Sequence, residues 1–283
     1  MATNIILVGG PNSGKSNYIA RLWISLSKKE GRLFAPRMPD KIDYVERLVK
    51  HLFAGDFVAR SDSSLHEQGN DLVVDVAVRD ANPEVSASLV VPDVLGEVWK
   101  SAVVDSRLAQ RWHDMLATST CALLFLHAND KGNCAALDWV TAGPLLAGGM
   151  GDETEATQLP TQVSLCELLR MLDDLLFKGD CRPRVAIIVA AWDKLDPTER
   201  ASAPIKYIEK QFPLFAGRLR DELEVDVRVF GLSVVGGDLS DPTFRDVLLE
   251  EGVLGHGYVV FEQSGKVEES KDVTVPLQWL LGQ

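Results

Sequence analysis

The sequence has little that would support a disulfide framework, a histidine-based metal centre or a membrane anchor. Its 283 residues include four cysteines, none of them in a C-x-x-C pair, and five histidines with neither HExxH nor HxH spacing. The cysteines therefore indicate reduced thiols in a cytoplasmic protein, without a zinc site. No apolar run approaches the length of a membrane span, and the run at residues 5–8 is too short for a secretory signal.

Basic residues are also in short supply. The chain holds 29 Lys and Arg against 41 Asp and Glu, which gives a formal net charge of −12. This balance disfavours electrostatic capture of nucleic acid or of an anionic membrane, so neither is an expected partner. The chain length allows one large α/β domain or two small ones, and with a hydrophobic content of 46% a sizeable core is possible.

The most informative stretch is the octet G-G-P-N-S-G-K-S at residues 9–16, which fits the phosphate-binding loop pattern G-x-x-x-x-G-K-[ST]. The apolar run 5–8 predicts a buried strand before it, and residues 15–28 predict a helix after it. We expect the loop amides and Lys15 to bind phosphates, and the Ser16 hydroxyl to bind Mg²⁺. The alternative is a chance match in a glycine-containing turn. The predicted phosphate-site residues are Gly9, Pro11, Asn12, Ser13, Gly14, Lys15, Ser16 and Asn17.

A second motif, P-D-V-L-G-E at residues 92–97, follows two predicted strands at 72–78 and 85–91. An Asp at the carboxyl end of a strand, with Gly three residues later, suits a phosphate-loop protein. Asp93 would support Mg²⁺, commonly through water, and the Gly96 amide would contact the γ-phosphate. The alternative is a β-turn that uses Pro and Gly.

A third motif, W-D-K-L-D at residues 192–196, ends the β-branched, apolar run 184–191, which is typical of a central parallel strand. Asp196 would accept hydrogen bonds from groups that guanine has and adenine lacks, and the Lys194 stem would cover a face of the base. Backbone near Ser233, where a further predicted strand at 225–232 ends, would complete the base pocket. The alternative is a solvated Lys–Asp pair in a charged loop.

The order of these motifs predicts an α/β fold, because ligand sites in open α/β sheets lie at the carboxyl ends of the strands. We expect a single domain over residues 1–283, with an insertion at about 128–162 and a C-terminal extension from about 240. The predicted helices cover residues 15–28, 43–53, 106–117, 165–177, 205–223 and 275–281.

The three motifs in this order resemble those of the TRAFAC-class GTPases, over roughly residues 4–236. The finer details G-G-P-N-S-G-K-S, P-D-V-L-G-E and W-D-K-L-D are similar to the bacterial double-GTPase families, which are predicted to act in neighbouring pairs within conflict or defence systems. This resemblance implies a three-layer P-loop NTPase fold with a mostly parallel sheet and one antiparallel edge strand. It also implies that Lys194 and Asp196 select guanine.

The sequence departs from the class pattern at three places. There is no threonine between Thr3 and Thr118 to serve as the usual Mg²⁺ ligand, so Ser61, Ser63 or Ser64 would stand in, or this switch is degenerate. Asp193 replaces the usual Asn or Thr beside the Lys, and an ionised carboxylate accepts hydrogen bonds without donating them. Glu97 stands where Ras-like members have glutamine, and there it would orient the attacking water or, alternatively, slow the chemistry through its charge near the γ-phosphate.

The resemblance implies that the protein binds GTP or GDP with Mg²⁺ and hydrolyses GTP to GDP and phosphate, slowly without a partner. Lys15, Glu97 and Arg60 are the candidate catalytic residues, with Arg60 as an arginine finger or, alternatively, a solvated loop residue. The predicted role is a nucleotide-dependent switch whose partner is a second GTPase, an effector or another copy of this chain. The alternatives are an ATP-binding P-loop ATPase and a non-hydrolysing interaction module, which the missing threonine favours.

Overall fold

The structure, a computed structural model, describes residues 3–58, 71–79, 87–91, 96–130, 132–133 and 159–283. Its centre is a nine-stranded sheet in the order β2-β3-β4-β1-β5-β6-β7-β8-β9. The strands are β1 (Thr3–Gly9), β2 (Leu33–Phe34), β3 (Leu72–Val78), β4 (Ala87–Val91), β5 (Cys121–His127), β6 (Arg184–Ala190), β7 (Asp226–Ser233), β8 (Tyr258–Gln263) and β9 (Lys266–Ser270).

The middle of the sheet is parallel. Strands β4, β1, β5, β6 and β7 pair in parallel registers, so their carboxyl ends lie at one edge of the sheet. The outer pairings of β2 with β3, β3 with β4, β7 with β8 and β8 with β9 are antiparallel. This arrangement gathers the loops that follow β1, β5, β6 and β7 on one side of the molecule.

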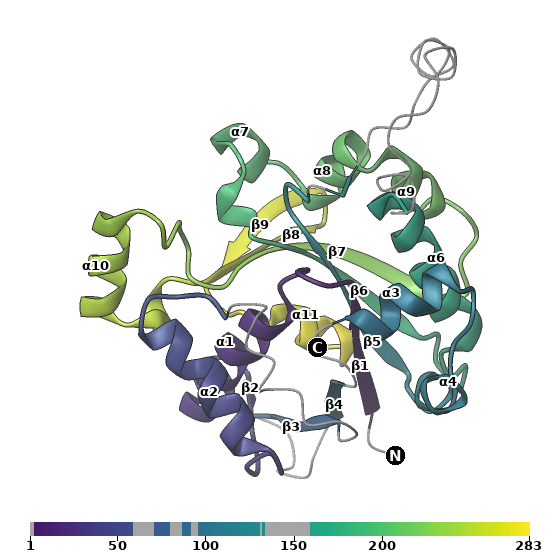
Figure 1. Cartoon of the computed structure of the whole chain (residues 1–283), viewed down its shortest axis with the longest axis horizontal. Helices are drawn as coiled ribbons and strands as arrows, with labels where there is room; N and C mark the ends of the chain where they lie inside the picture. The colour runs from purple at the N-terminus through teal and green to yellow at the C-terminus, as the bar shows by residue number, and fades with distance from the viewer. Residues whose placement is uncertain (1–2, 59–70, 80–86, 92–95, 131, 134–158) are drawn as a thin grey trace.

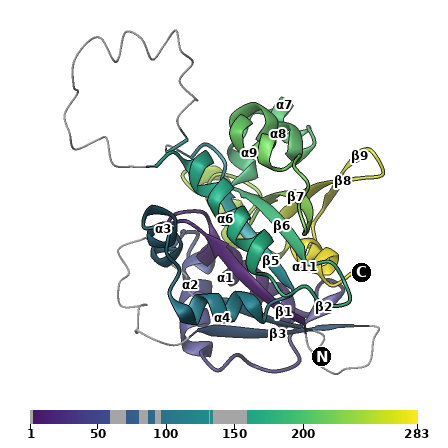
Figure 2. The same ribbon diagram turned by 90° about the vertical axis from the view of Figure 1, so that its right-hand side faces the viewer.

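Helices cover both faces of the sheet (Figure 1). Ile5 and Leu7 of β1 pack into one core, whereas Ile6 and Val8 pack into the other, as the two-residue period of a strand requires. One core is covered by α1 (Lys15–Lys28), α2 (Ile42–Phe53), α10 (Pro242–Glu251) and α11 (Val275–Leu280). The other is covered by α3 (Glu97–Val104), α4 (Gln110–Ala117), α6 (Thr161–Leu175), α8 (Pro204–Gln211) and α9 (Pro213–Arg218). Figure 2 looks toward the side that carries α4 and α6.

The predicted three-layer α/β fold with a mostly parallel sheet is confirmed. Two details of the prediction are wrong. The predicted helix at 205–223 is two helices, because Pro213 lacks the amide hydrogen that would continue α8, and it begins α9 instead. The prediction of one antiparallel edge strand is also incomplete, since β8 and β9 extend the sheet beyond β7 on the opposite side from β3.

The region from about residue 240 is built into the fold. Strand β8 pairs with β7, and Ser264 and Gly265, both with positive φ, form the two-residue turn into β9. Helix α11 packs against the sheet, where the backbone oxygen of Trp279 accepts a hydrogen bond from Arg184 at 3.1 Å. The predicted packing of this last segment on the sheet agrees with the structure.

The proposed insertion begins and ends at one place. Asp130, just after β5, accepts a hydrogen bond from the Thr161 hydroxyl at the start of α6 at 2.7 Å. The Thr161 backbone amide also donates to the Gly132 carbonyl at 3.1 Å. The chain therefore leaves β5 and enters α6 at adjacent points, and residues 134–158 between them lie outside the described part. Among the described residues, no helix combines the length and apolarity needed to span a membrane.

Candidate functional site

The phosphate loop connects β1 to α1 as the sequence predicts. Gly14 caps the amino end of α1 in a left-handed conformation (φ 98°), and a Cβ there would lie 2.7 Å from the Cβ of Ala190 at the end of β6. Only glycine fits both constraints. Asn12, at the exposed tip of the loop, is also left-handed (φ 59°). The loop is therefore held in a fixed shape in front of the positive end of the α1 dipole, which favours an anion.

Lys15 is buried under this loop, with 2% of its surface exposed. Its ammonium group donates to the backbone oxygens of Gly9 and Gly10, both at 2.7 Å, and to the Ser13 hydroxyl at 3.3 Å. These contacts place a positive charge inside the loop. A bound phosphate would offer the same ammonium a stronger, charged acceptor.

Gly96 approaches the loop from the second motif. It adopts a left-handed conformation (φ 83°) and caps the amino end of α3. A Cβ at this position would lie 2.5 Å from the backbone oxygen of Gly9 and 2.6 Å from Lys15 Nζ. The structure therefore brings the predicted γ-phosphate contact to the phosphate loop, and Glu97 follows it in the first turn of α3. Helix α3 itself was not predicted.

Asn17 lies one residue beyond Ser16 on α1 and has a structural contact. Its side-chain oxygen accepts a hydrogen bond from the Val58 amide at 3.2 Å. This bond fixes the chain just before the segment that carries Arg60, Ser61, Ser63 and Ser64. Those four residues, and the predicted metal residue Asp93, lie outside the described residues.

The third motif follows β6 and is anchored by a tryptophan. Ala191 is left-handed (φ 58°) and starts the short 3₁₀ helix η2 (Trp192–Lys194). Trp192 is fully buried, and its ring fills the space beside Gly231 of β7, where a Cβ would lie 2.4 Å from a ring carbon. Its indole N–H donates to the Arg200 carbonyl at 3.2 Å. Lys194 and Asp196 are thereby presented on the surface beside the end of β7.

Asp196 caps the short helix α7 (Pro197–Arg200). One carboxylate oxygen accepts hydrogen bonds from the Thr198 amide at 2.9 Å and the Glu199 amide at 3.0 Å. Hydrogen bonding, first from the Glu199 amide and then from that of Thr198, lowers the pKa of Asp196 below its ordinary value. The side chain is therefore oriented and ionised, as a hydrogen-bond acceptor for a base must be.

Asp193 connects the loop after β6 to the loop after β7. Burial raises the pKa of Asp193, and a hydrogen bond from the Ser233 hydroxyl opposes this shift. The Ser233 oxygen in turn accepts the Gly236 amide at 2.8 Å. The two predicted base-site residues Asp193 and Ser233 therefore lie together, and here their side chains bond to each other.

The sequence model of the Double-GTPase 1 family matches residues 6–280. The chain belongs to this family. The predicted resemblance to the double-GTPases is confirmed, and this Double-GTPase 1 chain is a GTP-binding phosphate-loop domain. No curated relative matches the sequence significantly.

Solved structures that resemble this Double-GTPase 1 chain are distant. The bacterial selenocysteine-specific elongation factor EF-Sec is 13% identical, with a TM-score of 0.37, over 89% of this chain and 29% of that one. The GTP-bound Ski7 GTPase-like domain of S. cerevisiae is 11% identical, with a TM-score of 0.44, over 82% and 43%. The SRb-GTP/SRX complex of Chaetomium thermophilum is 12% identical, with a TM-score of 0.39, over 87% and 97%. The chain thus spans less than half of the first two, and these likenesses carry no argument about function.

Two residues that support the site of this Double-GTPase 1 chain were missed by the sequence analysis. Trp192 anchors the loop after β6. The only indication of this role in the sequence was that a large aromatic residue directly follows a buried strand. Asn129 is left-handed (φ 57°), and its amide donates to the Tyr207 hydroxyl at 3.0 Å, while its side chain reaches the Lys194 carbonyl at 3.5 Å. Nothing in the local sequence indicated that Asn129 connects the end of β5 to the base loop.

Proposed function

We propose that this protein binds GTP with Mg²⁺ across the carboxyl ends of β1, β6 and β7, and hydrolyses it to GDP and phosphate. The observation that carries the proposal is that the three sequence motifs lie next to one another in the structure. Gly96 lies against Lys15 and the phosphate loop, and Gly14 of the same loop lies against Ala190, directly before the base-recognition loop. One nucleotide can therefore contact all three motifs.

The chain's own groups have separate roles in this proposal. Lys15 exchanges the carbonyl oxygens of Gly9 and Gly10 for phosphate oxygens and neutralises their charge. The Gly96 amide contacts the terminal phosphate, and Glu97 orients the water that attacks it in line. Asp196, held ionised by its backbone donors, accepts hydrogen bonds from guanine, and the Lys194 stem covers the base.

The donor set fits Mg²⁺, because the Ser16 hydroxyl follows Lys15 at the start of α1 and hard oxygen ligands suit this ion. Ser16 would hold the ion together with phosphate oxygens, and Asp93 and one of Ser61 or Ser63 are the further candidate ligands. When bound, Mg²⁺ would neutralise charge that develops on the phosphates.

Through hydrolysis, the protein would act as a nucleotide-dependent switch whose GTP and GDP forms differ in affinity for a partner. A second GTPase is the partner that the double-GTPase resemblance favours, in a bacterial conflict or defence system. An effector or a second copy of this chain are the other candidate partners, and Arg60 is a candidate arginine finger in cis.

Single-turnover phosphate release tests the hydrolysis. With GTP bound, the wild-type protein should release phosphate, and Glu97→Ala should release it at least about tenfold more slowly at unchanged GTP affinity, because groups that position or activate the attacking water contribute about 10²–10⁴-fold. Glu209→Ala, which removes a surface carboxylate on α8, is the matched control and should leave the rate unchanged. Full retention of bound GTP by the wild-type protein over a day would contradict hydrolysis. The missing threonine between Thr3 and Thr118 makes a non-hydrolysing module the second candidate, and that result would favour it.

A further inference from the structure

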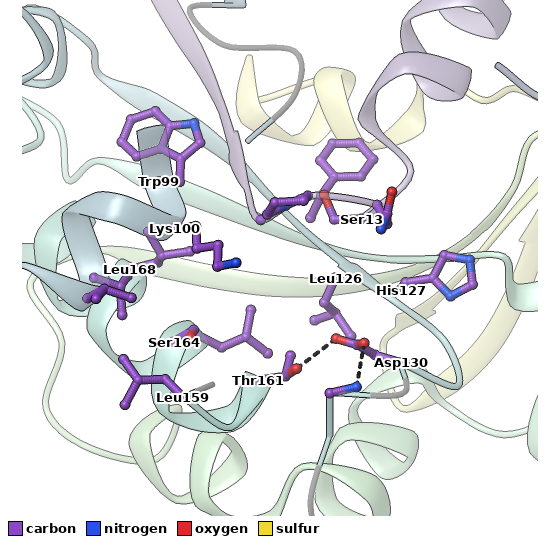
Figure 3. Close-up of a pocket in the computed structure, with 18 of the residues that line it drawn as sticks. Ser13, Trp99, Lys100, Leu126, His127, Asp130, Leu159, Thr161, Ser164 and Leu168 are labelled. Carbon is purple, nitrogen blue, oxygen red and sulfur yellow. Dashed lines mark hydrogen bonds between the residues drawn. The ribbon is translucent and has the colours of Figure 1, made fainter. Parts of the chain in front are cut away.

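A cavity of about 530 Å³ lies beside the phosphate loop (Figure 3). It is enclosed by residues 10–13 of that loop, by α3, by the end of β5 and by α6. None of Lys15, Ser16, Lys194 and Asp196 lines it. The cavity therefore adjoins the proposed nucleotide site and shares with it only the loop residues Pro11, Asn12 and Ser13.

The inner wall of the cavity is apolar. Leu126 of β5, Val103 of α3, and Leu165 and Leu168 of α6 line it, and each has at most 6% of its surface exposed. The volume lies within the range of about 300–1,000 Å³ that is usual for small-molecule sites, which combine such walls with a few placed polar groups. A ligand here would bury an apolar body.

The charged side chains among the described residues that line the cavity are those of Asp130 and Lys100. Both carboxylate oxygens of Asp130 accept hydrogen bonds, one from the Gly132 amide at 3.0 Å and the other from the Thr161 hydroxyl at 2.7 Å. Lys100 extends from α3 toward the space between α3 and α6 (Figure 3). No hydrogen bond or ion pair of its ammonium group is found with any described residue. Lys100 is exposed, so its ammonium group is hydrated and can exchange water for a charged acceptor that enters the cavity.

We propose that this cavity binds a small organic anion with a short apolar body, such as a medium-chain carboxylate. The carboxylate meets Lys100, and the hydrocarbon lies on Val103, Leu126, Leu165 and Leu168. Binding at this site would also be coupled to the nucleotide, a part that rests on the proposed function. Two cavity walls, residues 10–13 and α3 with Gly96 at its start, belong to the elements that would contact phosphates. Such coupling is reciprocal, so each ligand would change the affinity of the other by the same factor.

The test uses three probes with one hydrocarbon body and different head groups: octanoate, 1-octanol and octylammonium. Isothermal titration of the full chain, without nucleotide, should show octanoate as the tightest of the three. Lys100→Met should weaken octanoate about tenfold, the size expected for a lost hydrogen bond to a charged group, and leave 1-octanol unchanged. Lys50→Met, an exposed lysine on α2, is the matched control and should bind octanoate like the wild type.

A second variant tests the location. Ser164 is partly exposed and lines the cavity, so Ser164→Trp should fill the space and abolish octanoate binding with the thermal unfolding temperature preserved. Equal binding of the three probes, no octanoate binding at millimolar concentration, or unchanged binding in either variant would overturn the proposal. Repeating the titration with saturating GDP measures the coupling. Because the first titration contains no nucleotide, a failure of GTP to bind would leave its result intact.

Discussion

Asp193 and Asp196 are three residues apart, and their carboxyl groups experience opposite environments. Burial raises the pKa of Asp193, whereas backbone N–H donors lower the pKa of Asp196. A raised pKa makes ionised Asp193 unfavourable to the fold, so its contribution to stability is best below the unfolded pKa of about 3.9 and declines as pH rises through the folded pKa. Ionised Asp196 instead contributes stability above about pH 3.9, and that contribution is lost as pH falls through its lowered pKa.

Thermal unfolding of two variants tests these signs. Asp193→Asn keeps an acceptor for Ser233 and removes the buried charge, so relative to wild type it should be more stable at pH 7 than at pH 4. Asp196→Asn should be less stable than wild type at pH 7, with a smaller difference at pH 3. The two variants control for each other, because the substituted residues lie three positions apart in the same loop. Shifts of the same sign in both variants would show that the two environments are misassigned.

We predict that no other residue can replace Gly96 without loss of GTP affinity, because Gly96 lies against the phosphate loop. Gly96→Ala introduces a Cβ 2.6 Å from Lys15 Nζ, and the left-handed backbone adds strain. GTP affinity should fall at least about tenfold more than GDP affinity, since only the terminal phosphate depends on the Gly96 amide, and a hydrogen bond to a charged group carries an effect of that size. Equilibrium titrations with both nucleotides measure the difference.

Gly217→Ala provides the control for this substitution. Nothing lies within 4 Å of the added Cβ, and Gly217 is part of helix α9, where alanine should be neutral or stabilising. Equal losses of GTP and GDP affinity in Gly96→Ala would mean that Gly96 shapes the loop without sensing the third phosphate.

At the scale of elements, the helix that follows the phosphate loop is fastened to the C-terminal region by a buried arginine. Arg21 is fully buried in α1 and donates to Ser25, to Glu30 at 3.3 Å and to the Leu254 carbonyl at 2.9 Å. Leu254 belongs to the 3₁₀ helix η3 (Val253–Gly255), which follows α10. The contact connects two parts of the chain that are more than two hundred residues apart.

Arg21→Met should destabilise the protein by about 1–3 kcal/mol, because it removes the charged hydrogen bonds to Glu30 and to the Leu254 carbonyl. Hydrogen exchange should rise selectively in η3, which loses its contact with α1, and in α10, which packs against η3. Lys28→Met, at the exposed end of the same helix, is the control for the lost positive charge. An Arg21→Met protein with the stability and exchange pattern of Lys28→Met would contradict the assigned contact.

The sequence predicted those helices, strands and loops that are determined by residues close together in the chain. The strand, loop and helix around residues 5–28 were found because apolar periodicity and glycine positions agree there. Helix α3 was missed because E-V-W-K-S-A-V-V is rich in β-branched residues, and its start depends on Gly96 meeting the phosphate loop. The contact of Asn17 with Val58 and the pairing of Asp193 with Ser233 depend on tertiary packing, so no sequence pattern could show them. Predictions for Arg60, Ser61, Ser63 and Asp93 stay predictions.

For the whole molecule, the C-terminal region from about residue 240 should be essential for folding. Val259, Phe261, Val273, Leu277 and Leu280 from this region are part of one core. Each contributes about 1.5–3 kcal/mol if fully buried, so their sum is comparable to the total stability of about 5–15 kcal/mol of a typical domain. Deleting residues 240–283 should abolish the cooperative thermal transition seen by circular dichroism.

Deleting only the exposed Gln283 is the control for this truncation and should leave the transition unchanged. A truncated protein that still melted cooperatively and bound nucleotide would show that the region is an appendage to a smaller domain.

The account depends on one nucleotide that contacts Lys15 at its phosphates and Asp196 at its base. The most direct test is displacement of a fluorescent GDP analogue in the presence of Mg²⁺, with wild-type protein and Lys15→Met. GTP should displace the analogue from the wild type, a large excess of ATP should not, and folded Lys15→Met should fail to bind the analogue. Equal displacement by ATP and GTP, or full binding by Lys15→Met, would contradict the account.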